Sequence, residues 1–175
     1  MRREVFLHPG EFYFADGPAR IQTILGSCVA FTMRDPISGR AAMCHCLLPQ
    51  MPKGEGNVDG KTEKFRYVDT SFEGMLHEFR IRGVPAERLE IKLFGGANVI
   101  KAMSKTTAIG SLNWQQAKRS LQKLSLALSA HDVGGAAGRR LVFETVSGEV
   151  LVKRLRTIPE AKTARDRGAW HAQKA

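Results

Sequence analysis

The sequence has few cysteines and no long apolar run, and each shortage argues against a class of protein. The three cysteines, Cys28, Cys44 and Cys46, are odd in number and closely spaced, which does not suggest the disulfide framework of a secreted domain. A reducing, cytoplasmic setting is expected. No segment approaches the ~20 apolar residues of a membrane helix, and no apolar signal core follows Met1-Arg2-Arg3. We therefore expect neither export nor membrane insertion.

Acidic residues are scarce relative to basic ones. The chain has 27 lysines and arginines against 17 aspartates and glutamates, a formal net charge of +10, which favours an acidic partner. We do not expect this partner to be nucleic acid, because the basic residues are scattered without interleaved surface aromatics or a base-reading motif. Two interpretations of the charge stay open: a solvated basic face, or a surface that steers the protein toward acidic helices or an anionic membrane surface.

The length and the hydrophobic content fit one domain with a substantial core. The 175 residues are 43% hydrophobic. Short runs of strand-forming residues bounded by turn residues predict strands at residues 4–7, 11–14, 29–33, 40–48, 89–94, 141–146 and 150–155. With about two long helices beside them, the pattern predicts a single mixed α/β (α+β) domain with largely antiparallel strands and helices covering sheet faces.

Apolar residues at helical spacing predict the first long helix. The stripe lies within residues 72–79, and Asp69 or Thr70 can cap the start of the helix, which we expect to end near Arg82.

A second apolar stripe at helical spacing lies within residues 114–128. Asn113, with Gln116 three residues later, is similar to a capping box and predicts that this helix begins there. Asn98 is a candidate cap for a shorter helix through Met103.

The remaining segments have the composition of loops and a tail. Residues 49–64 are polar and glycine-rich and predict a loop, with a lid over a site as the alternative. Residues 132–139 predict a glycine-rich connection. We assign residues 1–158 to the domain and residues 159–175 to a basic, disordered tail.

A turn followed by a strand makes Cys28 a candidate nucleophile. Gly26 and Ser27 are turn residues, and a run of strand-forming residues follows at 29–33. A thiol at the mouth of a strand lies near unpaired backbone N–H groups, which are the donors that an acyl-transfer oxyanion needs.

His45 is the candidate partner of Cys28. It follows 17 residues later, across a turn at residues 35–39 that can join two paired strands. Alternation along the second strand puts His45 on one face and Cys44 and Cys46 on the other, and strand register decides whether His45 meets Cys28. An imidazole that stabilises the thiolate would make the cysteine reactive. Inert packing is the alternative for both residues, and the spacing argues against zinc.

Several separated motifs resemble one known family, the chemoreceptor glutamine deamidases called CheD. The similarity extends from about Pro9 to Leu155. The motifs, in chain order, are IQTILGSCVA at residues 21–30, Asp35-Pro36, His45 with Leu47-Leu48-Pro49, RYVDT at residues 66–70, KLFGGA at residues 92–97, Ile109-Gly110, Asn113, and DVGG at residues 132–135 with Gly138-Arg139.

The resemblance implies an activity and its residues. The family hydrolyses glutamine side-chain amides in chemoreceptors to glutamate and ammonia, and some members act on glutamyl methyl esters. The family's nucleophilic cysteine corresponds to Cys28, its general-base histidine to His45, and its supporting threonine to Thr23, with the adjoining Gln22 as the alternative. Gly26 and Ser27 would support the oxyanion near Cys28. No metal or organic cofactor is required.

The resemblance also implies a fold and partners. The fold would be a layered sandwich, with two sheets inside and helices outside, and the turn that holds Gly95 and Gly96 would lie near the active site. The expected partners are the cytoplasmic helices of chemoreceptors and a CheC-type phosphatase. A non-catalytic regulatory module that binds receptors or that phosphatase is the alternative function.

Overall fold

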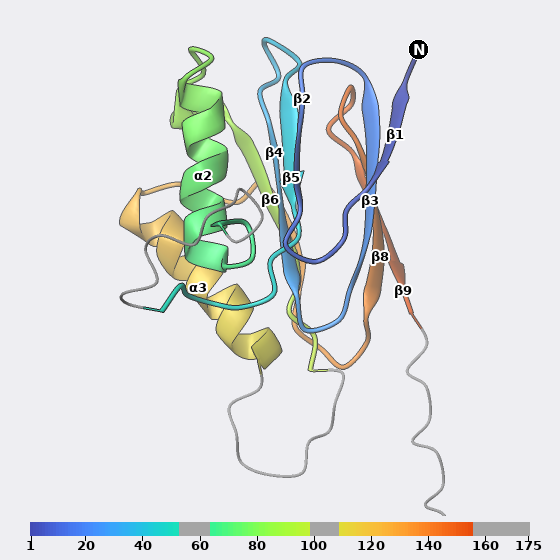
Figure 1. Cartoon of the computed structure of the whole chain (residues 1–175), viewed down its shortest axis with the longest axis vertical. Coiled ribbons are helices and arrows are strands. Elements are labelled where there is room, and N and C mark those ends of the chain that lie inside the picture. Colours follow the sequence, from blue (N-terminus) through green and yellow to red (C-terminus); the bar gives the residue numbers. More distant parts are fainter. Residues whose placement is uncertain (53–63, 99–108, 156–175) are drawn as a thin grey trace, which may run out of the picture.

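The protein is a three-layer structure in which two helices cover one of two stacked sheets. The computed structural model describes residues 1–52, 64–98 and 109–155. Helices α2 (Val68–Arg80) and α3 (Ile109–Lys123) lie on one side, a sheet of five strands is in the middle, and a sheet of four strands is on the other side (Figure 1). The α+β sandwich predicted from sequence is confirmed, and both helices lie on the same outer face.

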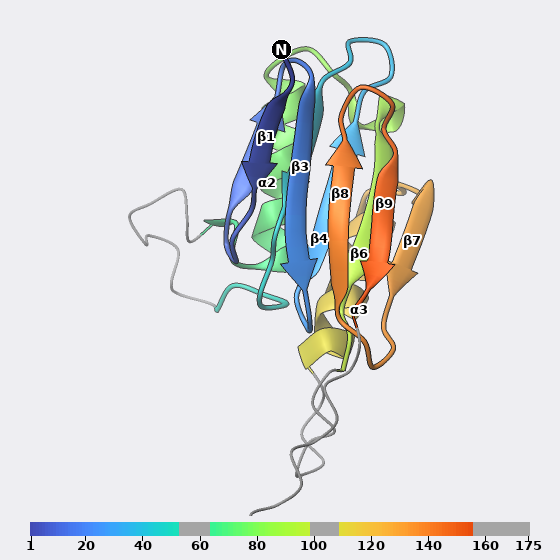
Figure 2. The same ribbon diagram turned by 90° about the vertical axis from the view of Figure 1, so that its right-hand side faces the viewer.

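Each of the two sheets contains strands from both the N-terminal and the C-terminal parts of the chain. The four-stranded sheet has the order β1 (Arg3–Phe6), β3 (Ala19–Leu25), β8 (Arg139–Glu144) and β9 (Val150–Arg154). The five-stranded sheet has the order β2 (Phe12–Ala15), β5 (Ala41–Cys44), β4 (Val29–Arg34), β6 (Glu90–Gly95) and β7 (Ala130–Val133). Among the strands of the described residues, only the pairs β1–β3 and β6–β7 are parallel, so the sheets are mixed and largely antiparallel. Figure 2 views the four-stranded sheet face-on.

Two strands are additions to those expected from sequence. β3 alternates buried and more exposed residues along its length, a period-two pattern that sequence analysis did not use. β7 includes Asp132 and Val133, which the sequence suggested were part of a glycine-rich connection. Its exposed edge position and short length leave little hydrophobic pattern to detect.

The helices begin earlier than their side chains suggested. Helix α2 spans Val68–Arg80, and its N-cap is Tyr67 with no side-chain cap, so the predicted cap at Asp69 or Thr70 is wrong. The predicted apolar stripe is confirmed, because Phe72, Met75 and Phe79 are buried. A short 3-10 helix, η1 (Ala86–Arg88), follows.

Helix α3 spans Ile109–Lys123, so Asn113 lies inside it and the predicted capping box is also wrong. The helix ends before Leu124, which is 47% exposed. The short helix expected from Asn98 to Met103, most of the loop expected at residues 49–64 and the tail at residues 159–175 lie outside the described residues.

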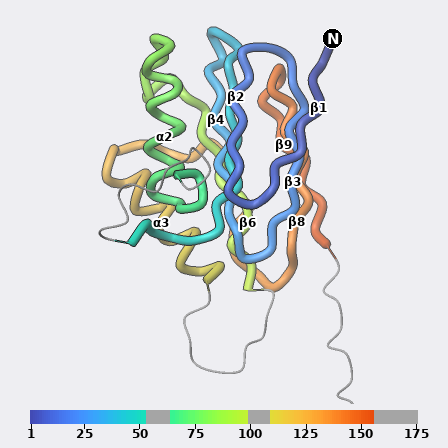
Figure 3. Tube along the Cα trace, in the orientation of Figure 1, coloured from blue at the N-terminus to red at the C-terminus, as the bar shows by residue number. Residues whose placement is uncertain are grey.

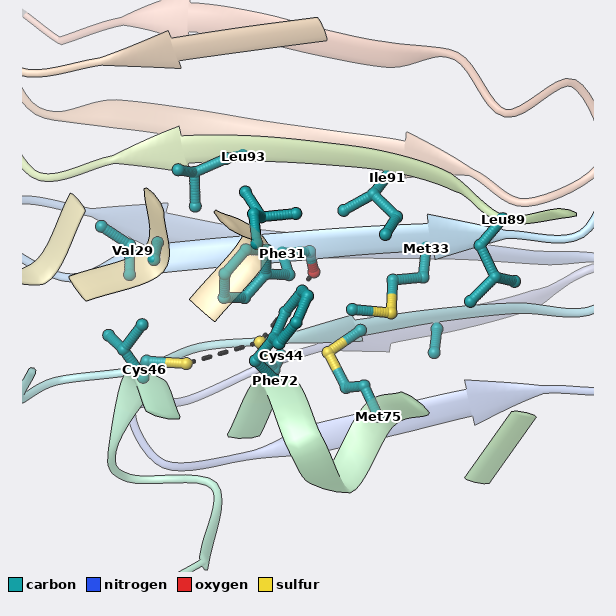
Figure 4. Packing of buried hydrophobic residues seen from close by; sticks show 14 of the residues in the cluster. Val29, Phe31, Met33, Cys44, Cys46, Phe72, Met75, Leu89, Ile91 and Leu93 are labelled. Atoms are coloured by element: carbon teal, nitrogen blue, oxygen red, sulfur yellow. Dashed lines mark hydrogen bonds between the residues drawn. The ribbon is translucent and has the colours of Figure 1, made fainter. Parts of the chain in front are cut away.

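The five-stranded sheet separates two hydrophobic layers of the core. One layer lies between this sheet and the helices, where Phe31 of β4 packs against Phe72 of α2 with ring centroids 4.9 Å apart (Figure 4). The other lies between the two sheets and includes Ile21, Met43 and Phe143. The sheets therefore hold each other by burial on their inner faces, and loops gather at the two ends of the strands (Figure 3).

Candidate active site

Cys28 closes the turn that joins β3 to β4. β3 ends at Leu25 and β4 starts at Val29, so Gly26, Ser27 and Cys28 form the connection, as expected from sequence. Figure 1 shows this turn at the lower end of the sandwich. The Cys28 side chain is half-buried and packs against the core between the sheets. The thiol is thus at the edge of an apolar layer.

Strand register puts His45 on the same face as Cys28. β4 and β5 pair with Thr32 opposite Met43, and the isolated bridge between Val29 and Cys46 continues this register. It places His45 opposite Ala30 and makes Cys28 its diagonal neighbour on that face. The backbone of His45 is fixed from the other side, because its N–H donates to the Glu11 carbonyl and its carbonyl accepts from the Gly10 N–H.

Thr23 determines which nitrogen of His45 carries the proton. The buried Thr23 hydroxyl donates to the Leu7 carbonyl oxygen at 2.7 Å and lies 2.8 Å from His45 Nδ1. Because a hydroxyl has one hydrogen, His45 Nδ1–H must donate to Thr23 Oγ1. The lone pair is then on Nε2, which is buried and has no hydrogen-bond partner within the described residues. This is the tautomer that a general base needs.

The adjoining Gln22 does not share this position. It points to the opposite, outer face of β3, where its Nε2 donates to Glu4 and its Oε1 accepts from Arg140. The geometry therefore gives Thr23, and not Gln22, the contact with His45.

Burial shifts the pKa of each member of the candidate pair toward its uncharged form. Burial raises the pKa of the Cys28 thiol above its ordinary value, and the backbone N–H of Cys28 only partly offsets this effect. Burial also lowers the pKa of His45, against smaller opposing effects of a hydrogen bond to the Leu7 backbone and of the Glu11 charge. At neutral pH these shifts favour a thiol beside a neutral imidazole, which can take the thiol proton as the sulfur attacks.

The turn at Gly95 and Gly96 packs directly on the Cys28 turn. The Gly96 N–H donates to the Cys28 carbonyl at 2.8 Å, and the Ala97 N–H donates to the Gly26 carbonyl at 3.0 Å. Gly95 has φ +105, and a Cβ atom there would lie 2.2 Å from the Cys28 carbonyl oxygen. A side chain at Gly95 could not be accommodated, so glycine allows the two turns to touch.

Asn113 is a residue of the site that sequence analysis missed. From inside α3, its fully buried side chain donates through Nδ2 to the Ser27 carbonyl at 2.9 Å and to the Leu47 carbonyl at 2.8 Å. Ser27 precedes Cys28, and Leu47 lies opposite Cys28 in the β4–β5 register. Asn113 therefore ties together the two backbone segments that carry Cys28 and His45.

Comparison with known proteins shows which family this chain resembles. A family model described as CheD chemotactic sensory transduction matches residues 47–154. A probable chemoreceptor glutamine deamidase CheD 2 of Geobacter sulfurreducens is 45% identical over 151 residues, covering 86% of this chain and 89% of the relative. The chemoreceptor glutamine deamidase CheD of Thermotoga maritima is 36% identical over 148 residues, covering 83% and 88%.

The chain belongs to the CheD family. The match to the family model begins at Leu47, after Thr23, Cys28 and His45. Within the described residues, no helix combines the length and the hydrophobicity that crossing a membrane requires.

A second set of contacts holds the glycine turn of this CheD protein. Arg139 is 1% exposed and donates to Asp132 Oδ1 and to the carbonyls of Ala137 and Gly134. The Gly134 N–H in turn donates to the Gly95 carbonyl at 2.9 Å. Arg139 therefore fixes a loop that supports the turn next to Cys28.

The other two cysteines of this CheD protein lie on the opposite face of the five-stranded sheet from Cys28. Cys44 and Cys46 are buried in the layer between the sheet and the helices, with their sulfur atoms 3.4 Å apart, as Figure 4 shows. The alternation expected along this strand is confirmed. In the described ranges, no three histidine, cysteine, aspartate or glutamate side chains are grouped as a metal site.

Proposed function

We propose that this protein is a protein-glutamine glutaminase that deamidates glutamine side chains of chemoreceptors, the activity for which its relatives are named. The observation that carries the proposal is the hydrogen bond from His45 Nδ1 to Thr23, which leaves Nε2 as the base on the face shared with Cys28. The substrate would be the cytoplasmic helical part of a receptor, so the enzyme would act in the cytoplasm. Residues 1–158 would form the catalytic domain and residues 159–175 a separate tail.

The first half of the reaction forms a thioester. The Cys28 sulfur attacks the side-chain amide carbon while His45 Nε2 takes the thiol proton. The backbone N–H groups of Ser27 and Cys28, which donate to no backbone carbonyl within the described residues, stabilise the oxyanion. The carbon–nitrogen bond then breaks, and the proton on His45 passes to the nitrogen, which leaves as ammonia.

The second half regenerates the enzyme. His45 Nε2 takes a proton from water as the oxygen attacks the thioester carbonyl. The carbon–sulfur bond breaks, the thiol regains its proton, and the product is glutamate. A glutamyl methyl ester would react by the same steps with methanol in place of ammonia.

The test measures intact mass and ammonia on a purified receptor cytoplasmic fragment, with the wild type beside Cys28→Ala. Conversion of an amide to an acid adds about one dalton per glutamine, and we expect a matched amount of ammonia only with the wild type. Binding of the fragment without any mass change, in both proteins, would favour the non-catalytic regulatory module. A CheC-type phosphatase, the other proposed partner, can be added to either assay.

The role of Thr23 has its own test. Thr23→Val keeps the shape of the side chain but removes the hydroxyl, so His45 loses the partner that fixes its tautomer. We expect kcat to fall about tenfold to a hundredfold, because a general base that is no longer well oriented loses part of its contribution to the rate. Thr23→Ser keeps the hydroxyl and should retain most of the activity. Equal activity of the two variants would remove Thr23 from the mechanism.

A further inference from the structure

The outer face of the four-stranded sheet carries side chains in rows that follow from the strand registers. This face looks toward the viewer in Figure 2, and the helices lie on the far side of the molecule. The row far from Cys28 contains Glu4, Arg20 and Glu144. The next row, called the apolar row, contains Phe6, Gln22, Val142 and Leu151. The row nearest Cys28, called the basic row, contains Ile24, Arg140 and Lys153.

The charges of the far row are compensated, whereas those of the basic row are not. Arg20 pairs with Glu144 and Glu4. Arg140 donates to the neutral amide of Gln22 at 3.0 Å. Within the described residues neither Arg140 nor Lys153 has a carboxylate at ion-pair distance. The end of the sheet next to the Cys28 turn therefore presents uncompensated positive charge.

Apolar side chains are exposed beside these cations. Phe6 is 46% exposed, Ile24 is 48% exposed and Leu151 is 49% exposed. Isolated exposed apolar residues are common on protein surfaces, but here they stand in adjacent rows of one sheet face that no described helix covers. Such a surface fits a partner that has apolar side chains flanked by carboxylates.

We propose that the apolar row and the basic row form the docking face for an acidic amphipathic helix of the receptor substrate. This inference rests on the proposed function. Four strands about 4.8 Å apart give a row about 14 Å long, which matches about ten residues of helix at 1.5 Å per residue. The two rows are two residues apart along the strands, about 7 Å, so one helix about 10 Å wide contacts both.

The position of the face relates it to the reaction. Ile24 of the basic row is four residues before Cys28, and the turn that carries Cys28 begins directly after Leu25. A helix held across the strands by its acidic and apolar side chains lies beside the end of the sandwich that carries the Cys28 turn, and the receptor segment that continues from it can pass over that end to the half-buried thiol. The face thus selects acidic helices and holds their neighbouring glutamines near Cys28.

The test is a charge reversal with a matched control. Arg140→Glu with Lys153→Glu is compared with Lys118→Glu and Arg119→Glu, two exposed residues of α3 on the opposite side of the molecule, so the net charge changes equally. Affinity for the receptor fragment is measured in the Cys28→Ala background, and kcat and KM are measured with Cys28 present. We expect KM and Kd to rise about tenfold or more only in the Arg140 and Lys153 variant, with kcat within about twofold.

Further measurements separate the outcomes. Phe6→Ser with Leu151→Ser should weaken binding without changing the charge. If the wild type releases ammonia and the charge-reversed variant has unchanged KM and Kd, the docking face is wrong and the proposed function stands. If the wild type releases no ammonia, the proposed function is wrong. If the wild type binds phosphatidylserine vesicles and the Arg140 and Lys153 variant does not, with KM unchanged, the face binds a membrane. If the wild type is a dimer and this variant is a monomer, with KM unchanged, the face binds a second copy. Either result overturns the proposal.

Discussion

At the scale of single residues, the opposite effects of burial on a thiol and an imidazole decide the resting state of the proposed active site. Burial raises the pKa of Cys28 and lowers the pKa of His45, so both shifts favour the uncharged forms. The free enzyme should then hold a thiol and a neutral imidazole, and not a preformed thiolate and imidazolium. Proton transfer to His45 would accompany attack on the amide.

The pH dependence of the protein tests this resting state. Alkylation of Cys28 by iodoacetamide needs the thiolate, so its rate should continue to rise above pH ~8.5, the ordinary value for a thiol. The acid limb of kcat/KM should lie below pH ~6.5, because protonation of His45 is disfavoured. Mass spectrometry of the Cys28 peptide distinguishes it from Cys44 and Cys46. An alkylation rate that is already constant from pH 6 would indicate a preformed ion pair.

Asn113 provides a second prediction at this scale. Asn113→Leu keeps a similar volume but removes the donor to the carbonyls of the half-buried residues Ser27 and Leu47, at a cost of about 1 kcal/mol for each hydrogen bond lost. The turn that carries Cys28 would shift, and we expect kcat to fall about tenfold to a hundredfold with KM nearly unchanged.

The control for Asn113 is on the same helix. Gln116 is also buried in α3, and its Oε1 has no partner within the described residues, so Gln116→Leu should keep kcat within about twofold. Both variants are assayed well below their melting temperatures. Equal loss of kcat in the two variants would mean that any disturbance of α3 lowers the activity, and that the two hydrogen bonds of Asn113 have no special role.

Sequence could supply the candidates Cys28 and His45, because a turn before a strand and alternation along a strand are local patterns. It could not supply their proximity, which depends on the β4–β5 register. Asn113 was misread for a related reason: asparagine is common at helix starts, and only the tertiary structure shows that its amide reaches two distant carbonyls.

At the scale of elements, the strands were easier to predict than the ends of the helices. Most strands have alternating or continuous apolar residues between turn residues, and that pattern survives in the fold. Helix α2 starts at Val68 without a side-chain cap. Backbone hydrogen bonds hold this start, and in one of them the Val68 N–H donates to the Leu48 carbonyl. No cap residue marks this start, so the sequence-based prediction placed it two to three residues too late.

The contact between the Gly95 turn and the Cys28 turn yields a prediction at this scale. Gly95→Ala would place a methyl group against the Cys28 carbonyl oxygen, so the strand and the turn must separate. We expect loss of most activity and a lower melting temperature. Gly135→Ala has a similar positive φ, +75, but no atom within 4 Å of the added Cβ, so it should cost only the backbone strain of about 1–2 kcal/mol.

The comparison of the two alanine variants separates contact from strain. Both are measured by thermal unfolding and by ammonia release on the same receptor fragment. If Gly135→Ala were as inactive as Gly95→Ala, backbone strain alone would explain the loss, and the close approach to Cys28 would have no special role.

At the scale of the whole molecule, the two ends of the sandwich have different tasks. The lower end in Figure 1 carries Cys28, and the upper end carries the β4–β5 turn with Asp35. Asp35 is fully buried and pairs with Arg88 Nη2 at 2.6 Å and with Arg88 Nε at 2.8 Å. This ion pair joins the turn to η1 and should support the fold without contributing to the chemistry.

The pKa of Asp35 allows a test of its structural role. Burial by itself would raise the pKa of Asp35, but the Arg88 guanidinium, the Ser38 hydroxyl and two backbone N–H groups lower it well below its usual range. A lowered pKa in the folded state means that the stabilisation is present above pH ~3.9, the unfolded value, and is lost as the pH falls further. The free energy of unfolding should therefore decrease on acidification below pH ~4.

Asp35→Asn should remove this part of the acid dependence and destabilise the protein by about 1–3 kcal/mol at neutral pH, because it breaks a pair whose carboxylate is buried and whose Arg88 side chain is 32% exposed. Asp16→Asn is the control at the same end: Asp16 pairs with Arg40 but is 64% exposed, so it should cost less than about 1 kcal/mol. Urea unfolding between pH 3 and pH 7 measures both.

Well below its melting temperature, Asp35→Asn should keep wild-type kcat within about twofold, since the pair lies at the end of the strands opposite Cys28. A large loss of kcat in the folded variant would show that the two ends are coupled.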